Sequence, residues 1–149
     1  ELGILTEMTS LYLYNNNFAG TIPTEIGTVT VLQELYMFNN SLTGAIPPEL
    51  STLIDLREFA VDNNRLTGTL PTEVGNWKAL TLLSVKNNSF TGTIPTELGK
   101  CSGLQFFDIS LNSMNGTWPS DLRSLIFLEY LDVAKNAFTG ILPEVGDVS

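Results

Sequence analysis

Apolar positions recur along this chain with a period of 24 residues. In the second copy of the period they are Leu32, Leu35, Met37, Leu42, Ile46, Leu50 and Leu53, and in the fourth copy they are Leu80, Leu83, Val85, Phe90, Ile94, Leu98 and Cys101. Self-similarity at a fixed spacing of roughly 20–50 residues is typical of repeat proteins, whose repeats bury their apolar side chains by packing on one another. The pattern therefore predicts a stack of similar coils around one continuous core.

Asparagine, glycine and proline follow the same period, each in six copies. The glycines are Gly20, Gly44, Gly68, Gly92, Gly116 and Gly140, and the prolines are Pro23, Pro47, Pro71, Pro95, Pro119 and Pro143. An asparagine amide has two donors and two acceptor lone pairs, enough to satisfy turn backbone in its own coil and in an adjacent coil. We therefore predict a structural asparagine ladder formed by Asn16, Asn40, Asn64, Asn88, Asn112 and Asn136.

Each copy has the pattern of one short strand followed by one short turn of helix. The apolar residues Leu35 and Met37 alternate with residues that are expected to be exposed, as in a half-buried strand. Stacked copies of such a strand form a parallel sheet. The segment between the proline and the next strand, such as 49–53, has the length of one 3-10 or helical turn. The predicted fold is an α/β solenoid: a right-handed superhelix with a parallel β-sheet on its concave face and short 3-10 or helical turns on its convex face.

The period also predicts where the repeats begin and end. We expect one domain over residues 1–149, with 1–7 as the end of a preceding repeat and repeats at 8–31, 32–55, 56–79, 80–103, 104–127 and 128–149. The last copy is expected to be incomplete or cap-like. Because Glu1-Leu2-Gly3 aligns with Glu25-Ile26-Gly27, the chain is expected to start inside a repeat and to be a fragment of a longer protein.

The amino-acid sequence of the repeat resembles that of one known family. Residues 87–99, Asn-Asn-Ser-Phe-Thr-Gly-Thr-Ile-Pro-Thr-Glu-Leu-Gly, are similar to the plant-type leucine-rich repeat L-x-x-L-x-L-x-x-N-x-L-x-G-x-I-P-x-x-L-G, and the resemblance covers residues 8–143. The motif Pro-Thr-Glu-[Ile/Val/Leu]-Gly at 23–27, 71–75 and 95–99 is as similar to the repeats of algal and protist proteins as to those of land plants. Family members are ectodomains of receptor-like kinases, receptor-like proteins and secreted polygalacturonase inhibitors. The resemblance implies an extracellular or cell-surface location and a binding function, whereas the cysteine-bearing caps of plant members are absent.

Composition narrows the function further. Sixteen acidic residues against seven basic ones give a net charge of −9, which disfavours nucleic acid and anionic membrane surfaces as partners. There is no histidine, the commonest general base and metal ligand, and the single cysteine, Cys101, occupies a core column of the repeat. No apolar run is long enough to insert into a membrane. We therefore expect no enzyme, no cofactor and no metal in this segment.

Candidate binding residues are those that flank the core positions of the strands on the concave face. Aromatic residues exposed in clusters often mark binding sites, although cross-strand aromatic packing that only stabilises the sheet gives the same pattern. The predicted ligand-binding residues are Tyr12, Tyr14, Glu34, Tyr36, Phe38, Glu58, Asp62, Leu82, Phe106, Asp108, Tyr130 and Asp132.

Two further groups of residues have specific interpretations. Asp108 and Asp132 are expected to be cross-strand neighbours, either as a solvated acidic surface or as a carboxylate pair for acid–base chemistry or calcium. Asn-x-Ser/Thr sequons make Asn39, Asn87 and Asn115 candidate N-glycosylation sites, which we expect to be accessible.

Three functions compete on this sequence. The first is a non-catalytic binding module of a receptor-like protein, whose parent chain carries a membrane span. Its ligand would be a peptide or a protein, which includes proteins associated with polysaccharides. The second is a secreted enzyme inhibitor or a structural protein of a cell wall or extracellular assembly. The third is ice binding through threonines that flank the column glycine, such as the Thr-Gly-Thr rungs at 67–69 and 91–93.

Overall fold

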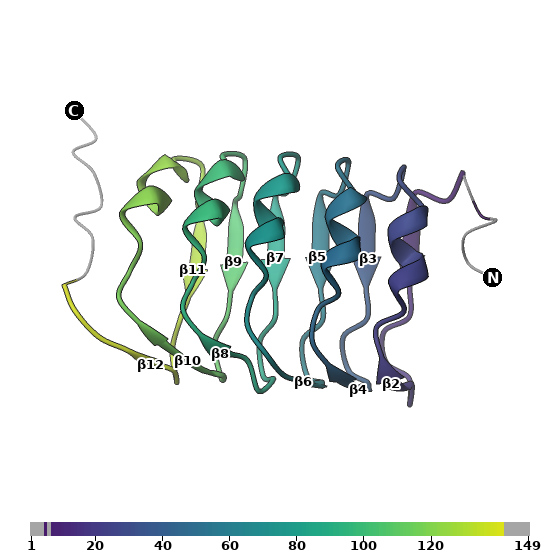
Figure 1. The fold of residues 1–149 in the computed structure, drawn as a ribbon, viewed down its shortest axis with the longest axis horizontal. Helices are drawn as coiled ribbons and strands as arrows, with labels where there is room; N and C mark the ends of the chain where they lie inside the picture. The colour runs from purple at the N-terminus through teal and green to yellow at the C-terminus, as the bar shows by residue number, and fades with distance from the viewer. Residues whose placement is uncertain (1–4, 6, 142–149) are drawn as a thin grey trace.

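The structure is a computed structural model that describes residue 5 and residues 7–141. One parallel sheet of six short strands runs through it, with one strand from each coil, and we number the coils 1 to 6 by these strands. The strands are β1 (Ser10–Tyr12), β3 (Glu34–Tyr36), β5 (Glu58–Ala60), β7 (Leu82–Ser84), β9 (Phe106–Asp108) and β11 (Tyr130–Asp132). Figure 1 shows this sheet behind a row of short helical turns.

The helical turns are 3-10 segments that follow the column proline of each coil. They are η2 (Thr24–Thr28), η3 (Pro48–Thr52), η4 (Thr72–Asn76), η5 (Thr96–Lys100) and η6 (Ser120–Ser124). The proline before each segment has extended backbone, for example φ −66° and ψ 133° at Pro47, so it ends the extended chain where the turn begins. The predicted solenoid, with parallel strands on one side and short 3-10 turns on the other, is confirmed.

A second set of short parallel strands follows the main-sheet strands and precedes the 3-10 turns along the chain. The sequence pattern did not predict this set. One sheet contains β2 (Ala19–Thr21), β4 (Ser41–Gly44) and β6 (Arg65–Leu66), and the other contains β8 (Thr91–Gly92), β10 (Ser113–Gly116) and β12 (Ala137–Phe138). With two to four residues each, these strands are too short to show an alternation of apolar and polar positions.

The register of the main sheet places equivalent residues of successive coils side by side. The Cα partners in β1, β3 and β5 are Leu11, Leu35 and Phe59 in the core column. The same register continues through Leu83, Phe107 and Leu131. Because every step is 24 residues, a column in the sequence becomes a row of contacting side chains in the structure.

The column asparagines connect neighbouring coils from inside the turn. The Nδ2 of Asn64 donates to Val61 O (3.0 Å) and Asp62 O (3.2 Å) of its own coil and to Met37 O (3.0 Å) of the preceding coil. Its Oδ1 accepts from the Leu42 N–H at 2.9 Å. The same amide therefore satisfies backbone groups of two coils that have no partner in a regular strand or helix.

Close packing between successive 3-10 turns depends on glycine in most coils. A Cβ on Gly27 would lie 2.4 Å from Glu49 O, and one on Gly99 would lie 2.5 Å from Asp121 O. The equivalent residue of coil 2 is Ser51, whose side chain excludes such an approach. Accordingly, η3 and η4 are less closely packed than the other neighbouring turns.

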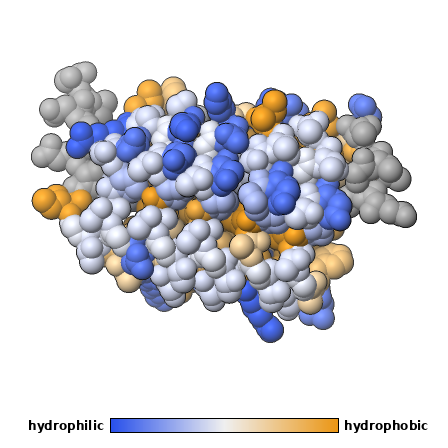
Figure 2. All heavy atoms as spheres, viewed as in Figure 1, coloured by the Kyte–Doolittle hydropathy of each residue, from blue (hydrophilic) through white to orange (hydrophobic). Residues whose placement is uncertain are grey.

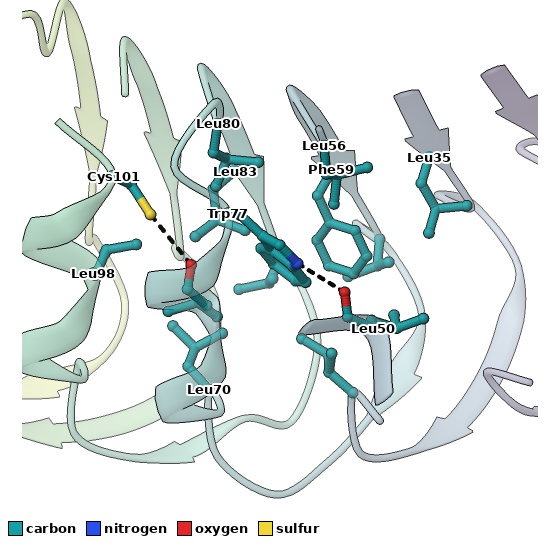
Figure 3. Close-up of a cluster of buried hydrophobic side chains, with 14 of the residues drawn as sticks. Leu35, Leu50, Leu56, Phe59, Leu70, Trp77, Leu80, Leu83, Leu98 and Cys101 are labelled. Carbon is teal, nitrogen blue, oxygen red and sulfur yellow. Dashed lines mark hydrogen bonds between the residues drawn. The ribbon is translucent and has the colours of Figure 1, made fainter. Parts of the chain in front are cut away.

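Trp77 fills the additional space between η3 and η4. It stands in the core column that holds Leu53 and Cys101 in the neighbouring coils, and only 1% of it is exposed. Its ring lies 5.2 Å from the ring of Phe59, and its indole N–H donates to Leu50 O at 2.9 Å (Figure 3). The largest side chain of the column therefore lies where two neighbouring 3-10 turns are least closely packed.

Cys101 is part of the same core. The side chain is buried and its Sγ lies 3.2 Å from Val74 O, the carbonyl that corresponds to the one bound by Trp77 one coil earlier (Figure 3). Burial raises the pKa of the thiol to about 11. A thiol in this state packs as a small apolar residue and is a poor nucleophile.

Candidate functional site

The candidate binding residues lie on the face of the main sheet that points away from the core, together with the residues just after each strand. We call this surface the sheet face. Its first column consists of Glu34, Glu58, Leu82, Phe106 and Tyr130, and its second column consists of Tyr12, Tyr36, Ala60, Ser84, Asp108 and Asp132. Residues of each column are Cα partners in adjacent strands, so their side chains are within contact distance.

Four aromatic rings form one continuous group over coils 1 and 2. Tyr12 stacks on Tyr36 with ring centroids 5.1 Å apart, and Tyr14 stacks on Phe38 at 4.6 Å. The two pairs contact each other, since the centroids of Tyr36 and Phe38 are 6.1 Å apart. Tyr12 is 52% exposed and Tyr14 is 39% exposed. The structure thus brings together the first predicted aromatic group and leaves a large part of it accessible.

Two glutamates border this aromatic group. The hydroxyl of Tyr12 donates to Glu34 Oε2, and the hydroxyl of Tyr36 donates to Glu58 Oε2, one coil further in each case. The hydrogen bond to Glu34 raises the pKa of Tyr12, whereas burial, followed by the bond to Glu58, raises the pKa of Tyr36. Both phenols therefore remain neutral donors at physiological pH.

A second apolar group lies over coils 4 to 6. Phe106 stacks on Tyr130 with centroids 4.2 Å apart and ring planes at 2°. Leu82 is the Cα partner of Phe106 in the next strand, so the three residues form a row. Tyr130 is 41% exposed, and Leu82 and Phe106 are half-buried.

A polar network lies on the sheet face over coils 3 to 5. The Ser84 hydroxyl donates to Asp62 Oδ1, which also accepts from the Lys86 N–H at 3.2 Å. The Lys86 ammonium forms an ion pair of 3.3 Å with Asp108 Oδ2. Asp108 Oδ1 accepts from the Ser110 N–H at 2.9 Å and from its hydroxyl at 2.6 Å. Burial raises the pKa of Asp62 above its ordinary value.

The network corrects one expectation about exposure. Asp108 is only 3% exposed, so the interpretation of this residue as part of a solvated acidic surface is wrong, and Ala60, Ser84 and Ser110 are buried as well. The reason is that Lys86 and Ser110 occupy both carboxylate oxygens of Asp108. Asp132, its Cα partner, is half-buried and accepts from the Ala134 N–H at 2.9 Å.

Within the part of the chain that the structure describes, no cluster of three acidic, cysteine or histidine side chains could hold a metal ion. Asp108 and Asp132 also lack a third ligand there. The sheet face offers aromatic rings for stacking, hydrogen-bonding groups and charges.

A second asparagine ladder lies on the outside of the turns, and the sequence interpretation missed it. Asn39, Asn63 and Asn87 each donate from Nδ2 to the Oδ1 of the asparagine one coil earlier, at 2.6, 2.7 and 2.8 Å. All have positive φ, between 51° and 56°, which asparagine tolerates better than most residues. The signal was present as the doubled asparagines at 15–16, 39–40, 63–64 and 87–88.

The three sequon asparagines lie in different settings. Asn39 and Asn87 belong to the outer ladder, and Asn115 lies in β10 outside it. All three are exposed, so their modification remains a prediction that the geometry permits.

The threonines considered for ice binding have a structural use. The hydroxyls of Thr43 and Thr91 donate to the glycine carbonyls of the preceding coil, Gly20 O at 3.2 Å and Gly68 O at 3.1 Å. These hydroxyls are directed to the backbone and connect coils, which leaves fewer of them for an ordered external lattice.

Known proteins resemble this chain both in sequence and in structure. The family model for the Leucine Rich Repeat matches residues 7–29, 31–53, 55–77 and 79–101. A solved structure of the plant peptide hormone receptor RGFR1 in complex with RGF2 is similar, with a TM-score of 0.94 and 38% identity over 97% of this chain and 23% of that chain. The comparison with curated proteins gave no match.

Two Arabidopsis structures are also similar. The ectodomain of the membrane receptor kinase GASSHO1/SCHENGEN3 in complex with CASPARIAN STRIP INTEGRITY FACTOR 2 has a TM-score of 0.96 and 39% identity, over 99% of this chain and 18% of that chain. The ectodomain of the receptor kinase HAESA in complex with an extended IDA peptide hormone has a TM-score of 0.89 and 33% identity, over 93% and 23%. This chain thus spans about a fifth to a quarter of the length of these relatives.

Proposed function

Since this chain belongs to the leucine-rich-repeat family, we propose that it is a non-catalytic segment of an extracellular, receptor-like protein that binds a peptide or protein ligand on its sheet face. The observation that carries the proposal is the exposed aromatic group on an otherwise regular sheet. Tyr12, Tyr14 and Tyr130 keep between 39% and 52% of their surface accessible, on a face that no described element covers. Exposed tyrosines supply large contact areas at low entropic cost, which is why they are enriched among interface residues.

The opposite side of the molecule has a different character. Figure 2 shows that hydrophilic side chains gather over the 3-10 turns, where exposed charges of both signs include Glu25, Glu49, Lys78 and Lys100. Ile54, Ile126 and Phe127 are also exposed just after η3 and η6, but among the described residues no pair of aromatic rings forms there. A mixture of charges with single exposed apolar residues is typical of a solvated surface. The contrast between the two sides supports the sheet face as the binding surface.

The relatives support a peptide as the ligand. RGFR1 was solved with RGF2, and the HAESA ectodomain was solved with a peptide hormone. The described residues contain no helix that is long and apolar enough to cross a membrane. We also propose an anchoring span in the parent chain, on the ground that the similar GASSHO1/SCHENGEN3 ectodomain belongs to a membrane receptor kinase.

The test is a selection of binders from a library of random peptides displayed on phage, followed by affinity measurements on variants of the chain. We expect Tyr12→Ala and Tyr14→Ala to weaken the selected peptides by about 10-fold or more, as truncation of an exposed hot-spot tyrosine does. The matched control is Phe18→Ala, because Phe18 is an aromatic residue with 48% exposure outside the sheet face.

Circular dichroism melts of all three variants would verify that each remains folded. Peptides that lose affinity with Phe18→Ala and keep it with both tyrosine variants would contradict the proposal.

A further inference from the structure

The sheet face presents two carboxylates of the same charge directly opposite each other. Glu34 and Glu58 are Cα partners in β3 and β5, and both are half-exposed. Like charges in this arrangement destabilise a sheet. Among the residues that the structure describes, the only ion pair is that of Lys86 with Asp108, so no basic side chain neutralises the two glutamates.

The hydrogen bonds of these glutamates leave part of each carboxylate available. Tyr12 and Tyr36 each donate to one oxygen, Oε2, of Glu34 and Glu58 respectively. Within the described residues no donor reaches the Oε1 atoms of the two side chains. The tyrosines therefore fix the position of both carboxylates while leaving one acceptor oxygen of each for a ligand.

The arrangement matches one cationic group better than others. Adjacent strands are about 4.8 Å apart, so the two carboxylates are separated by a distance that a planar guanidinium with five N–H donors can bridge. Guanidinium also stacks on aromatic rings, and Tyr12 and Tyr36 lie beside the carboxylates. An ammonium group is a compact, strongly hydrated charge and uses neither the separation nor the rings as well.

We propose that Tyr12, Glu34, Tyr36 and Glu58 bind the arginine side chain of an extended peptide ligand. This inference rests on the proposed function, since it assigns a chemistry to part of the same sheet face. The charge complementarity follows from the two unneutralised glutamates, and the net charge of −9 would attract a basic peptide at long range.

The same column also predicts what the peptide carries next to its arginine. Beyond Glu58 the column continues with Leu82, Phe106 and Tyr130, which form an apolar row. The midpoint between β3 and β5 is two strand spacings, about 10 Å, from the midpoint between β7 and β9. An extended peptide advances about 3.3 Å per residue, so a ligand that crosses the strands would place a large apolar side chain three positions from its arginine.

The experiment uses the intact chain and a short probe peptide, acetyl-Gly-Arg-Gly-Gly-Phe-Gly-amide. Titrations followed by the backbone amide signals in nuclear magnetic resonance spectra give both the affinity and the location of binding. We expect shifts in β3, β5, β7 and β9, and an affinity that falls by about 10-fold when citrulline, which has the same shape without the charge, replaces the arginine. Lysine in that position should cost less, and a spacing of one residue between arginine and phenylalanine should weaken binding.

Variants of the chain provide the second arm. Glu58→Gln keeps the shape and the hydrogen bond with Tyr36 and should weaken the arginine peptide by about 10-fold, with little effect on the citrulline peptide. The matched control is Glu49→Gln in η3, which removes the same charge from an exposed side chain on the opposite side. Equal affinity for the arginine and citrulline peptides, or equal losses in the two glutamine variants, would overturn the inference.

The phage selection separates this inference from the proposed function. If the selected peptides lose binding to the Tyr14→Ala variant but are not enriched in arginine, the proposed arginine site is wrong, whereas peptide binding on the sheet face still holds. Enrichment of arginine three positions from a large apolar residue would support both.

Discussion

Replacement of one asparagine of the inner ladder should have a large effect in the middle of the stack and a small effect at its first coil. Asn88 Nδ2 donates to Val61 O (3.0 Å), Val85 O (3.1 Å) and Lys86 O (3.2 Å), and its Oδ1 accepts from the Leu66 N–H at 2.9 Å. Leu66 is fully buried, so no water can replace the acceptor. Asn88→Ala therefore leaves a buried N–H without a partner.

The magnitude follows from these bonds. An unsatisfied buried donor costs about 1–3 kcal/mol, and the weakened carbonyl contacts add to this, so we expect Asn88→Ala to lower the free energy of unfolding by about 3 kcal/mol. Among the described residues, Asn16 Nδ2 donates only to Leu13 O at 3.2 Å and to Tyr14 O at 3.1 Å, and Asn16 is exposed. Asn16→Ala should therefore cost about 1 kcal/mol at most.

Urea unfolding followed by circular dichroism measures both values. With a slope of about 2 kcal/mol per molar urea, the midpoint should fall by about 1.5 M for Asn88→Ala and by about 0.5 M or less for Asn16→Ala. An unchanged slope would indicate that the variants still unfold as one unit, whereas a lower slope would reveal separate unfolding of coils. Equal losses at the two positions would refute the idea that the bond between coils is the stabilising one.

Three further changes test other parts of the structure. Because burial raises the pKa of the Cys101 thiol to about 11, native protein at pH 8 should resist iodoacetamide and react only when unfolded; labelling at the rate of free cysteine would contradict this. Because the pKa of Asp62 is raised in the folded state, protonated Asp62 stabilises the fold at pH values below its ordinary pKa of 3.8, and this stabilisation is lost as the pH rises through the folded-state pKa. Asp62→Asn, which stays neutral, should therefore gain stability relative to the wild type over this pH window, as measured by urea titrations. A Cβ at position 99 would meet Asp121 O at 2.5 Å, whereas the nearest atom at Gly103 is 3.8 Å away, so Gly99→Ala should destabilise by about 1–3 kcal/mol in thermal melts and Gly103→Ala by clearly less.

The fold followed from the sequence because one repeat length controls every level of it. The 24-residue spacing places Leu35 next to Leu11 and Phe59 and makes each column a contact, so core and surface could be separated residue by residue. The pairs Tyr12–Tyr36 and Phe106–Tyr130 follow from the same register, and both stack.

The features that the sequence did not predict depend on departures from the repeat or on side-chain detail. The burial of Asp108 requires Lys86 and Ser110 from neighbouring positions, and a column pattern does not indicate which long side chain folds over which short one. The outer ladder was not predicted because the sequons at Asn39 and Asn87 suggested glycosylation and because positive φ is not visible in an apolar pattern. Hydrogen bonds from Tyr36 to Glu58 likewise need the direction in which each ring leans.

Ser51, which stands where other coils have glycine, affects the curvature of the solenoid at the proposed arginine site. The strands of coils 2 and 3 keep their backbone hydrogen bonds, such as Met37 N to Ala60 O at 2.8 Å, while η3 and η4 are held apart by Ser51 and Trp77. A solenoid that is wider on its outside than on its inside bends at that point. We expect such a bend between β3 and β5 to bring the Glu34 and Glu58 side chains closer together, so that a packing residue on the outer surface influences how tightly the inner surface holds a cation.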